Sequence, residues 1–326
     1  MKKHRSCLAA AVILLAGGLA GCSQDRSSLH YFLRGTLEAK KGHVQQAIGE
    51  LSMAIARNPD LVLAYAARGQ LYKTRRQYEL AAADFKRACQ LEPYDFDNHY
   101  ELGLMYQYLN ELRKAVVAYQ DAVGLRPYDT NANTNLAVVY AEGGHPYTAM
   151  DYAQRAVRGN TKSAAAHANL GAIYAQLADK NPHYLHLAID ELKESVELDP
   201  HQSAIYLDLA AEYLKLHQYE QARETLVTAE GLGPSPLVSE RLGYCYYKLG
   251  NMPRAMRAYQ NSLKQNPSYT QARNGLGVVF MTQALRSNPP AVALARGALK
   301  QWRQSLRIKP NQPVIRELLS EYSPKQ

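Results

Sequence analysis

Apolar and small residues recur along this chain at the three- and four-residue spacing of an amphipathic helix. Residues 64–93 show the pattern best. Two runs of ring and small side chains each fall on one helical face: Tyr65, Gly69 and Tyr72, then Ala81, Phe85 and Ala88. Pro93 follows, and it ends the second helix because it has no backbone N–H to donate. The pattern predicts a helical hairpin whose rings fill the gap between its two helices.

The same features return at a period of mostly 34 residues, which predicts eight hairpins over residues 28–310. Prolines close most units: Pro59, Pro93, Pro127, Pro200, Pro234 and Pro267. The small residue of the first helix recurs as Gly35, Gly69, Gly103, Ala137, Gly171, Ala210, Gly243 and Gly277. A ring follows three residues later in all units but the first: Tyr72, Tyr106, Tyr140, Tyr174, Tyr213, Tyr246 and Phe280. The second helix carries an alanine: Ala47, Ala81, Ala115, Ala149, Ala188, Ala222, Ala255 and Ala298.

This period and these residues resemble the tetratricopeptide repeat. The resemblance implies an all-α fold, an α-solenoid of about eight repeats in a right-handed superhelix. It also implies that first helices line a concave face and second helices form the outside. Such solenoids hold peptides or other protein domains and are not known for chemistry of their own.

The first residues have the pattern of a targeting segment, and we do not expect them to belong to the fold. A basic head (Lys2, Lys3, Arg5) precedes an apolar run over residues 8–20, which is shorter than the ~20 residues that span a bilayer. The run ends in Leu-Ala-Gly-Cys22, which resembles a bacterial lipobox. The resemblance implies a lipoprotein signal peptide over residues 1–21 and acyl chains on Cys22. The alternative is an ordinary signal peptide with a chance cysteine.

A lipidated tether over residues 22–27 would place the first repeat close to a membrane. Ser23, rather than Asp, follows the cysteine, which favours the outer membrane, facing the periplasm, in sorting of the enterobacterial type. At the other end, residues 311–326 form a predicted capping segment. Within it, Val314, Leu318 and Tyr322 recur at spacing four, which predicts a helix that covers the last repeat.

Three places depart from the regular repeat. In repeat four, Ala153 takes the aromatic position of the second helix and Gly143-Gly144 makes the turn, so we expect a point of flexibility there. Repeat five has about five extra residues near 178–183, and repeat eight has about nine near 286–291. These insertions are expected to be extensions of helices or loops, and the alternative is a partner contact.

The charge distribution divides the chain. Residues 22–240 hold 21 basic and 27 acidic side chains, whereas residues 241–316 hold thirteen basic and no acidic ones. Six of the thirteen form a predicted basic patch: Arg254, Arg257, Arg296, Lys300, Arg303 and Arg307. One-signed charge attracts anionic partners, although it is also compatible with a merely solvated surface. A nucleic acid is not expected behind a secretion signal.

The geometry implied by the resemblance assigns partner-binding residues to the concave face. They are Tyr100, Gln107, Tyr108, Asn131, Thr134, Asn135, Asn169, Asp208, Arg241, Tyr244, Tyr247, Lys248 and Asn274. Asn135, Asn169 and Asp208 occupy equivalent positions and resemble a ladder of amides that pairs with an extended peptide backbone. The alternative is that these side chains bond to a neighbouring helix.

No enzyme signature is present. The ten histidines show no metal-ligand spacing, and no glycine-rich phosphate loop precedes a helix, so neither a cofactor nor a metal is expected. His99 and His167 stand where a ring is usual and are expected to be packed. Cys89 and Cys245, about four repeats apart, are expected to fill the core without a disulfide.

Together these features predict a lipid-anchored periplasmic adaptor that binds protein segments. Envelope proteins that resemble it serve pilus or secretin assembly, exopolysaccharide export or recruitment of cell-wall hydrolases. The alternative is direct binding of an anionic polysaccharide by repeats seven and eight.

Overall fold

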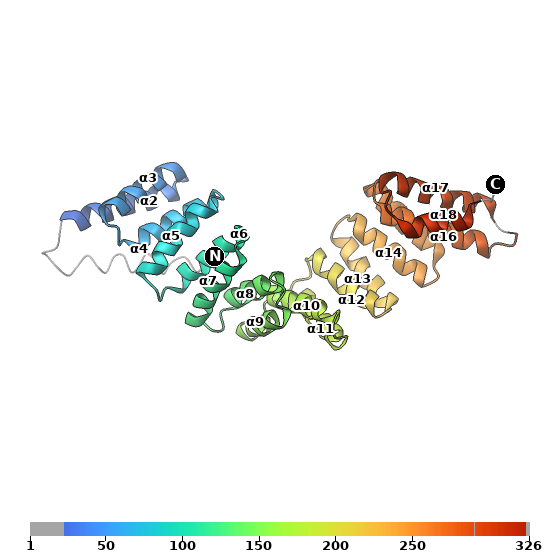
Figure 1. The fold of residues 1–326 in the computed structure, drawn as a ribbon, viewed down its shortest axis with the longest axis horizontal. Coiled ribbons are helices and arrows are strands. Elements are labelled where there is room, and N and C mark those ends of the chain that lie inside the picture. Colours follow the sequence, from blue (N-terminus) through green and yellow to red (C-terminus); the bar gives the residue numbers. More distant parts are fainter. Residues whose placement is uncertain (1–22, 290, 324–326) are drawn as a thin grey trace. The chain divides into compact units, whose positions relative to one another are not determined.

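The computed structural model describes residues 23–289 and 291–323, and these residues form α-helices and no strand. The signal segment and Cys22 lie outside the described residues. The chain divides into two compact units, residues 1–143 and 144–326. Within each unit, consecutive helices fold back on one another as hairpins (Figure 1). The predicted all-α solenoid of helical repeats is confirmed.

The first unit contains seven helices in its described part. They are α2 (Ser23–Lys40), α3 (Val44–Arg57), α4 (Val62–Thr74), α5 (Tyr78–Leu91), α6 (Phe96–Tyr108), α7 (Leu112–Leu125) and α8 (Thr130–Glu142). The hairpins are α2 with α3, α4 with α5 and α6 with α7. The first helix of repeat four, α8, closes this unit.

The second unit begins with the second helix of repeat four. Its helices are α9 (Pro146–Gly159), α10 (Ala164–Ala178), α11 (His183–Leu198), α12 (Ser203–Lys215), α13 (Tyr219–Leu232), α14 (Pro236–Lys248), α15 (Met252–Gln265), α16 (Thr270–Arg286), α17 (Val292–Ile308) and α18 (Pro313–Tyr322). The insertions of repeats five and eight lengthen helices: α10 and α11 have 15 and 16 residues, and α16 and α17 have 17 each.

Where the second helix carries a ring, that ring requires the glycine of the first helix. A Cβ atom on Gly103 would lie 2.6 Å from Cδ1 of Tyr119, and one on Gly277 would lie 2.3 Å from Nε1 of Trp302. Because real Cβ contacts are longer, the two helices of a hairpin can approach this closely only where the side chain is absent. The recurring glycines therefore allow the close approach of the two helices.

The turn inside most repeats contains one residue in the left-handed backbone region. This residue is Gly42, Arg76, Asn110, Gly144, His217 or Gly250, with φ between 57° and 81°. A left-handed residue after a helix turns the chain toward the next helix, and glycine adopts this conformation most easily. The position is left-handed in six repeats, and the two repeats without it are those with an insertion.

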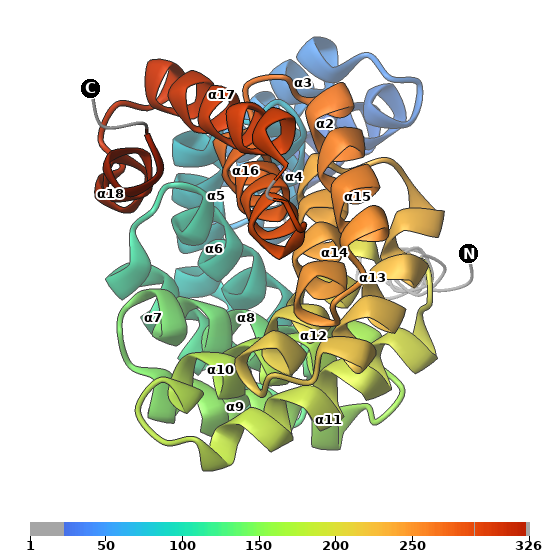
Figure 2. The same cartoon turned by 90° about the vertical axis from the view of Figure 1, so that its right-hand side faces the viewer.

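The C-terminal helix α18 covers the last hairpin (Figure 2). Ile315 is its buried residue, and Leu318, Leu319 and Tyr322 pack against the cluster around Trp302. The predicted capping helix is therefore present, but one of its assigned contacts is wrong. Val314 is 64% exposed, because the buried stripe begins one residue later.

Candidate functional site

The first helices of successive repeats contact one another within each unit: α2 with α4, α6 with α8, α10 with α12 and α14 with α16. They therefore form one side of each stack, as the repeat geometry requires. We call this side the first-helix face. The residues predicted to bind a partner lie on α6 and α8 in the first unit and on α10, α12, α14 and α16 in the second.

Three predicted residues of the first unit share a hydrogen-bond network with a tyrosine from a second helix. The Asn135 amide donates to the hydroxyls of Tyr100 (3.2 Å) and Tyr119 (3.3 Å). The Tyr119 hydroxyl donates to Oε1 of Gln107 at 2.9 Å. Burial raises the pKa of both Tyr100 and Tyr119, so the hydroxyls stay protonated. Asn135 is thus held by neighbouring side chains through its NH₂ group, while its amide oxygen carries no hydrogen bond within the described part of the chain.

The remaining predicted residues of this unit are more accessible. Tyr108 is exposed, and its ring stacks on Tyr78 with centroids 4.8 Å apart. Asn131 is exposed and Thr134 is half-buried, both on α8. The face therefore offers a tyrosine stack beside a polar network.

The amide ladder is not a uniform feature. Asn169 donates to the Ala165 carbonyl of its own helix at 2.8 Å. Asn135 and Asn169 belong to different units. Asp208 has an exposed side chain, yet the surrounding protein removes enough water to raise the pKa of its carboxyl. A peptide-binding role for the three residues stays a prediction.

In the second unit, Lys248 sits among tyrosine rings. Its Nζ atom lies 5.6 Å from the ring centroid of Tyr244 and 5.7 Å from that of Tyr219. The Tyr219 and Tyr244 rings meet edge to face at 6.2 Å. The Tyr247 hydroxyl is 3.5 Å from Oγ1 of Thr282. The ammonium group is held by ring faces, an arrangement that leaves its N–H donors available to a carboxylate or a carbonyl.

Two other predicted residues of this unit have structural partners. Arg241 is exposed and lies 3.7 Å from the Glu240 carboxylate. The Asn274 amide donates to Gln312 at 2.8 Å, and the backbone carbonyl of Asn274 accepts from Trp302 Nε1 at 3.2 Å. Asn274 therefore joins α16 to the linker before α18.

We expect Glu240→Gln to raise the free energy of unfolding near neutral pH. Loss of water raises the pKa of the Glu240 carboxyl, although Arg241 opposes this shift. The folded chain therefore binds this proton more tightly than the unfolded chain. Above the raised pKa the carboxylate is charged in a poorly hydrated place, which destabilises the fold, whereas glutamine stays neutral. Urea unfolding at about pH 7 and about pH 3 tests this. The gain should be present at the higher pH only, and equal changes at both would contradict it. Glu317→Gln is the exposed control.

The predicted basic patch lies on second helices, and all six of its side chains are exposed. Arg254 and Arg257 are on α15, and Arg296, Lys300, Arg303 and Arg307 follow one another on α17. Arg254 also lies over the Tyr246 ring at 5.7 Å. None of the six forms an ion pair with another described residue. The patch is thus free to meet an anion, and it is separate from the first-helix face.

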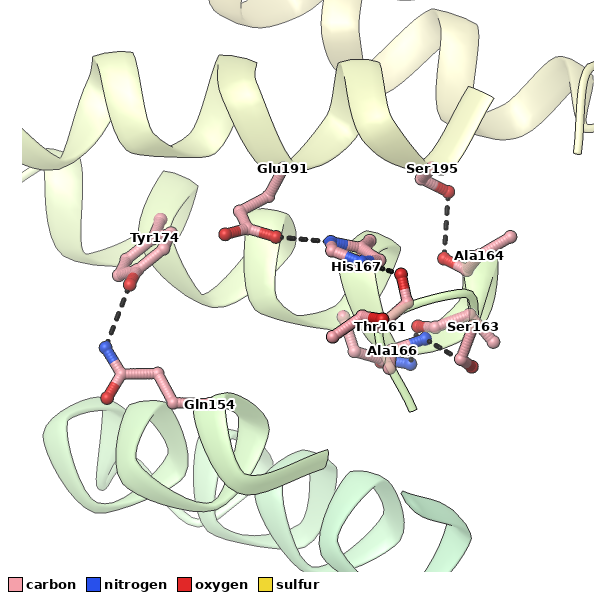
Figure 3. Close-up of polar contacts among 11 residues, drawn as sticks. Gln154, Thr161, Ser163, Ala164, Ala166, His167, Tyr174, Glu191 and Ser195 are labelled. Carbon is pink, nitrogen blue, oxygen red and sulfur yellow. Dashed lines mark hydrogen bonds and ion pairs between the residues drawn. The ribbon is translucent and has the colours of Figure 1, made fainter. Parts of the chain in front are cut away.

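The two histidines of interest are part of the fold. His167 Nδ1 lies 2.6 Å from Oε2 of Glu191, and its Nε2 donates to the Thr161 carbonyl at 3.1 Å (Figure 3). His99 Nε2 donates to the Pro93 carbonyl at 2.9 Å. Both side chains are buried, which confirms that they are packed.

This bond to the linker recurs along the chain. In five linkers, the side chain six residues after the linker carbonyl donates to it. The pairs are His99 with Pro93, Asn133 with Pro127, His167 with Thr161, Arg273 with Pro267, and Arg316 with Pro310. The linker bond fixes the path between repeats, because the carbonyl would otherwise lack a partner at the helix start.

The two remaining cysteines are free and buried, one in each unit. Burial raises the pKa of each thiol to about 12, so neither is a thiolate at neutral pH. Their predicted role as core fillers is confirmed. Among the described residues, no group of three His, Cys, Asp or Glu side chains could hold a metal ion. Those residues also contain no helix long and apolar enough to cross a membrane.

Comparisons with known proteins identify the repeat. Tetratricopeptide repeat models match residues 32–96 and 207–261, and another matches residues 96–129. Tetratricopeptide repeat protein 28 of Homo sapiens is 29% identical over 104 residues, and that of Mus musculus is 29% identical over 102 residues. These stretches cover 32% and 31% of this chain but only 4% of either relative.

Solved structures share the fold. The C-terminal part of a TPR repeat-containing protein from Cytophaga hutchinsonii aligns with a TM-score of 0.62 and 18% identity, over 75% of this chain and 99% of that one. The Cut9-Hcn1 hetero-tetramer of APC/C aligns with a TM-score of 0.55 and 16% identity, over 86% of this chain and 53% of that one. Tetratricopeptide repeats are thus recognised over the matched residues, and the helical hairpins share the fold of the solved structures.

Proposed function

We propose that this protein is a lipid-anchored periplasmic adaptor. It holds an extended segment of another envelope protein against its first-helix face and so supports the assembly of an envelope machine. Pilus or secretin assembly, exopolysaccharide export and recruitment of cell-wall hydrolases are the candidate settings. Tetratricopeptide repeats are interaction modules, which supports the binding role.

One observation carries the binding proposal: the first-helix face combines ring faces with hydrogen-bonding groups held in place. Lys248 is held between Tyr219 and Tyr244, and Asn135 is held between Tyr100 and Tyr119. Rigid aromatic side chains lose little entropy on binding. The Lys248 ammonium can donate to a backbone carbonyl, and the free amide oxygen of Asn135 can accept from a backbone N–H. Both clusters therefore suit a peptide better than a small substrate.

We expect the combined change Tyr244→Ala and Lys248→Ala to weaken binding of the partner by about tenfold or more. The change removes the cation and one of its two rings, while Tyr219 stays in place. A tagged chain with and without the change is used to recover partners from envelope extract, which are quantified by mass spectrometry.

The matched control is Tyr94→Ala with Lys193→Ala, which removes an exposed tyrosine and an exposed lysine elsewhere. Circular dichroism confirms that all variants fold. Equal recovery with both pairs of changes would exclude the Tyr244–Lys248 cluster from binding.

The anchor is proposed from the sequence alone. The basic head, the short apolar run and Cys22 support lipidation, and Ser23 supports transfer to the outer membrane. Several acyl chains hold a protein firmly, since each buried CH₂ adds ~0.8 kcal/mol. Cys22→Ala should release the chain from the membrane fraction. If the unaltered chain is already soluble, the anchor does not exist.

The exposed basic patch favours a second candidate function, direct binding of an anionic polysaccharide. The stripe on α17 presents four unpaired cations, and α15 adds two. Surface attraction of this kind is screened by salt within ~8 Å at physiological ionic strength. Polysaccharide binding should therefore collapse as salt rises, whereas peptide binding to the first-helix face should persist.

A further inference from the structure

The first unit contains a groove on the side opposite the first-helix face. It has a volume of about 640 Å³ and lies between the second helices α5 and α7, with α6 as its floor. The floor residues His99, Leu102 and Tyr106 are three and four positions apart. They therefore share one face of α6, and Gln107 and Tyr108 belong to another. We call this the outer groove.

The outer groove is lined mainly by apolar atoms. Leu102 and Tyr106 form the floor, Cys89 and Ala118 form the walls, and Val117 stands at the edge with 58% of its surface exposed. A hollow of this size and lining can bury apolar side chains. Leu102, Cys89 and Ala118 are buried, whereas the Val117 side chain faces water.

The edge of the outer groove is positively charged. Lys86, Arg113 and Lys114 line it, against one acidic side chain, Asp121. Lys114 pairs with Glu111 at 2.6 Å and lies over the Tyr106 ring at 5.4 Å. Within the described residues, Lys86 and Arg113 have no ion-pair partner. This positive edge does not follow from local composition, since residues 22–240 carry an excess of acidic side chains.

A buried polar atom in the floor lacks a hydrogen bond. His99 is only 9% exposed, and its Nε2 must carry the proton because it donates to the Pro93 carbonyl. In the neutral ring, Nδ1 is therefore an acceptor, and no described residue donates to it. The Asp121 carboxylate lies 3.5 Å from this atom, and it cannot donate when ionised. A donor from outside the chain would satisfy this atom.

The second unit provides an internal comparison. Leu242, Tyr246 and Ala258 form an equivalent hollow, where Arg254 takes the place of Lys114 over the tyrosine ring. This hollow is smaller, about 370 Å³. Ser239 stands in the place of His99, and its hydroxyl accepts hydrogen bonds from Asn261 and Gln265. Both units thus contain such a hollow, but the groove of the first unit is larger and has an unsatisfied polar atom in its floor.

We propose that the outer groove is a second docking site, and that its occupant is an acidic amphipathic segment of a partner protein. Apolar side chains of the segment lie on Leu102 and against Val117. A hydroxyl or N–H group of the segment donates to His99 Nδ1. Carboxylates of the segment pair with Lys86 and Arg113. The site does not depend on the first-helix face, so one chain could hold two segments at once.

The test uses a short fluorescein-labelled peptide with leucines on one helical face and glutamates on the other. Its binding to the purified chain is followed by fluorescence anisotropy. Val117→Asp and Arg113→Glu should each weaken binding by about tenfold or more, which corresponds to at least ~1.4 kcal/mol. Both residues are exposed, so folding should be preserved, and thermal melting confirms it. Val227→Asp, at an exposed valine of α13, should leave binding unchanged.

Two further probes sharpen the result. A peptide of the same composition in scrambled order should bind at least about tenfold more weakly. Vesicles containing phosphatidylglycerol should not compete with the peptide. The proposal is overturned if the peptide does not bind, if Val117→Asp has no effect, or if the vesicles alone bind in a manner that depends on Arg113. Loss of binding with the Tyr244 and Lys248 changes would instead place the peptide on the first-helix face.

Discussion

Trp302→Ala is expected to lower the free energy of unfolding of the second unit by about 3–5 kcal/mol. Trp302 is 1% exposed and is the largest fully buried side chain among the described residues. It packs in a cluster with Met281, Leu299 and Ile315, and so it joins the last hairpin to the capping helix. Its removal would leave a cavity beside Gly277, which has no side chain to fill it.

Urea unfolding followed by far-UV circular dichroism measures this effect. The fluorescence of the chain cannot be used for the variant, since Trp302 is its only tryptophan. Trp302→Phe is the matched control, because it keeps a ring and loses mainly the hydrogen bond to the Asn274 carbonyl. It should cost less than the alanine change. Loss of less than about 1 kcal/mol in Trp302→Ala would contradict the central position of the ring.

Asp84→Ala is expected to destabilise the first unit by about 3–5 kcal/mol. The Asp84 carboxylate accepts two hydrogen bonds from Arg68, at 2.8 and 2.7 Å, and Asp84 is 4% exposed. Arg68 also donates to Ser52 at 2.9 Å, so the ion pair links three helices. The hydrogen bond to Asp84 raises the pKa of Arg68. Removing the carboxylate would leave an uncompensated charge with little access to water.

Arg68→Met combined with Asp84→Ala separates the two contributions. The double variant has no unpaired charge, so it should be more stable than Asp84→Ala alone. Asp60→Ala removes one partner of an exposed pair with Arg87 and should change stability by less than about 1 kcal/mol. Thermal and urea unfolding measure all three variants. An Asp84→Ala chain as stable as Asp60→Ala would show that the buried pair is dispensable.

The architecture could be predicted from the sequence because the same hairpin pattern recurs along the chain. Gly103 and Tyr119 recur in register with equivalent residues, so a single hairpin explains the others. The predicted capping helix was also correct in its place, because Pro313 and the apolar spacing define it. Its buried stripe was displaced by one residue, since Val314 and Ile315 are both apolar and only the contact with α17 decides between them.

The candidate site was less predictable, because its contacts join residues distant in the chain. Tyr119 fills the core of its own hairpin, but its hydroxyl also reaches Asn135 of the next repeat. Tyr78 and Tyr219 lie at the starts of second helices, outside the positions that the repeat pattern assigns. Their recurrence directly after a turn is the sequence feature that could have indicated them.

Two features of the backbone also escaped prediction. Arg76, Asn110 and His217 adopt left-handed conformations. A sequence indicates this conformation clearly only where glycine occupies the position. The division of the chain at Gly143 and Gly144 falls within repeat four, the repeat with the weakest pattern. Its sequence suggested flexibility, but a boundary between compact units depends on the sum of contacts, which one repeat does not reveal.

The linker bond has a consequence for how such chains diverge. Histidine, asparagine and arginine share neither shape nor charge, yet each offers an N–H at the reach that the linker carbonyl requires. Selection at this position would therefore act on a chemical capacity rather than on an amino-acid identity. Substitutions there that look radical in an alignment can leave the spacing of the hairpins unaltered.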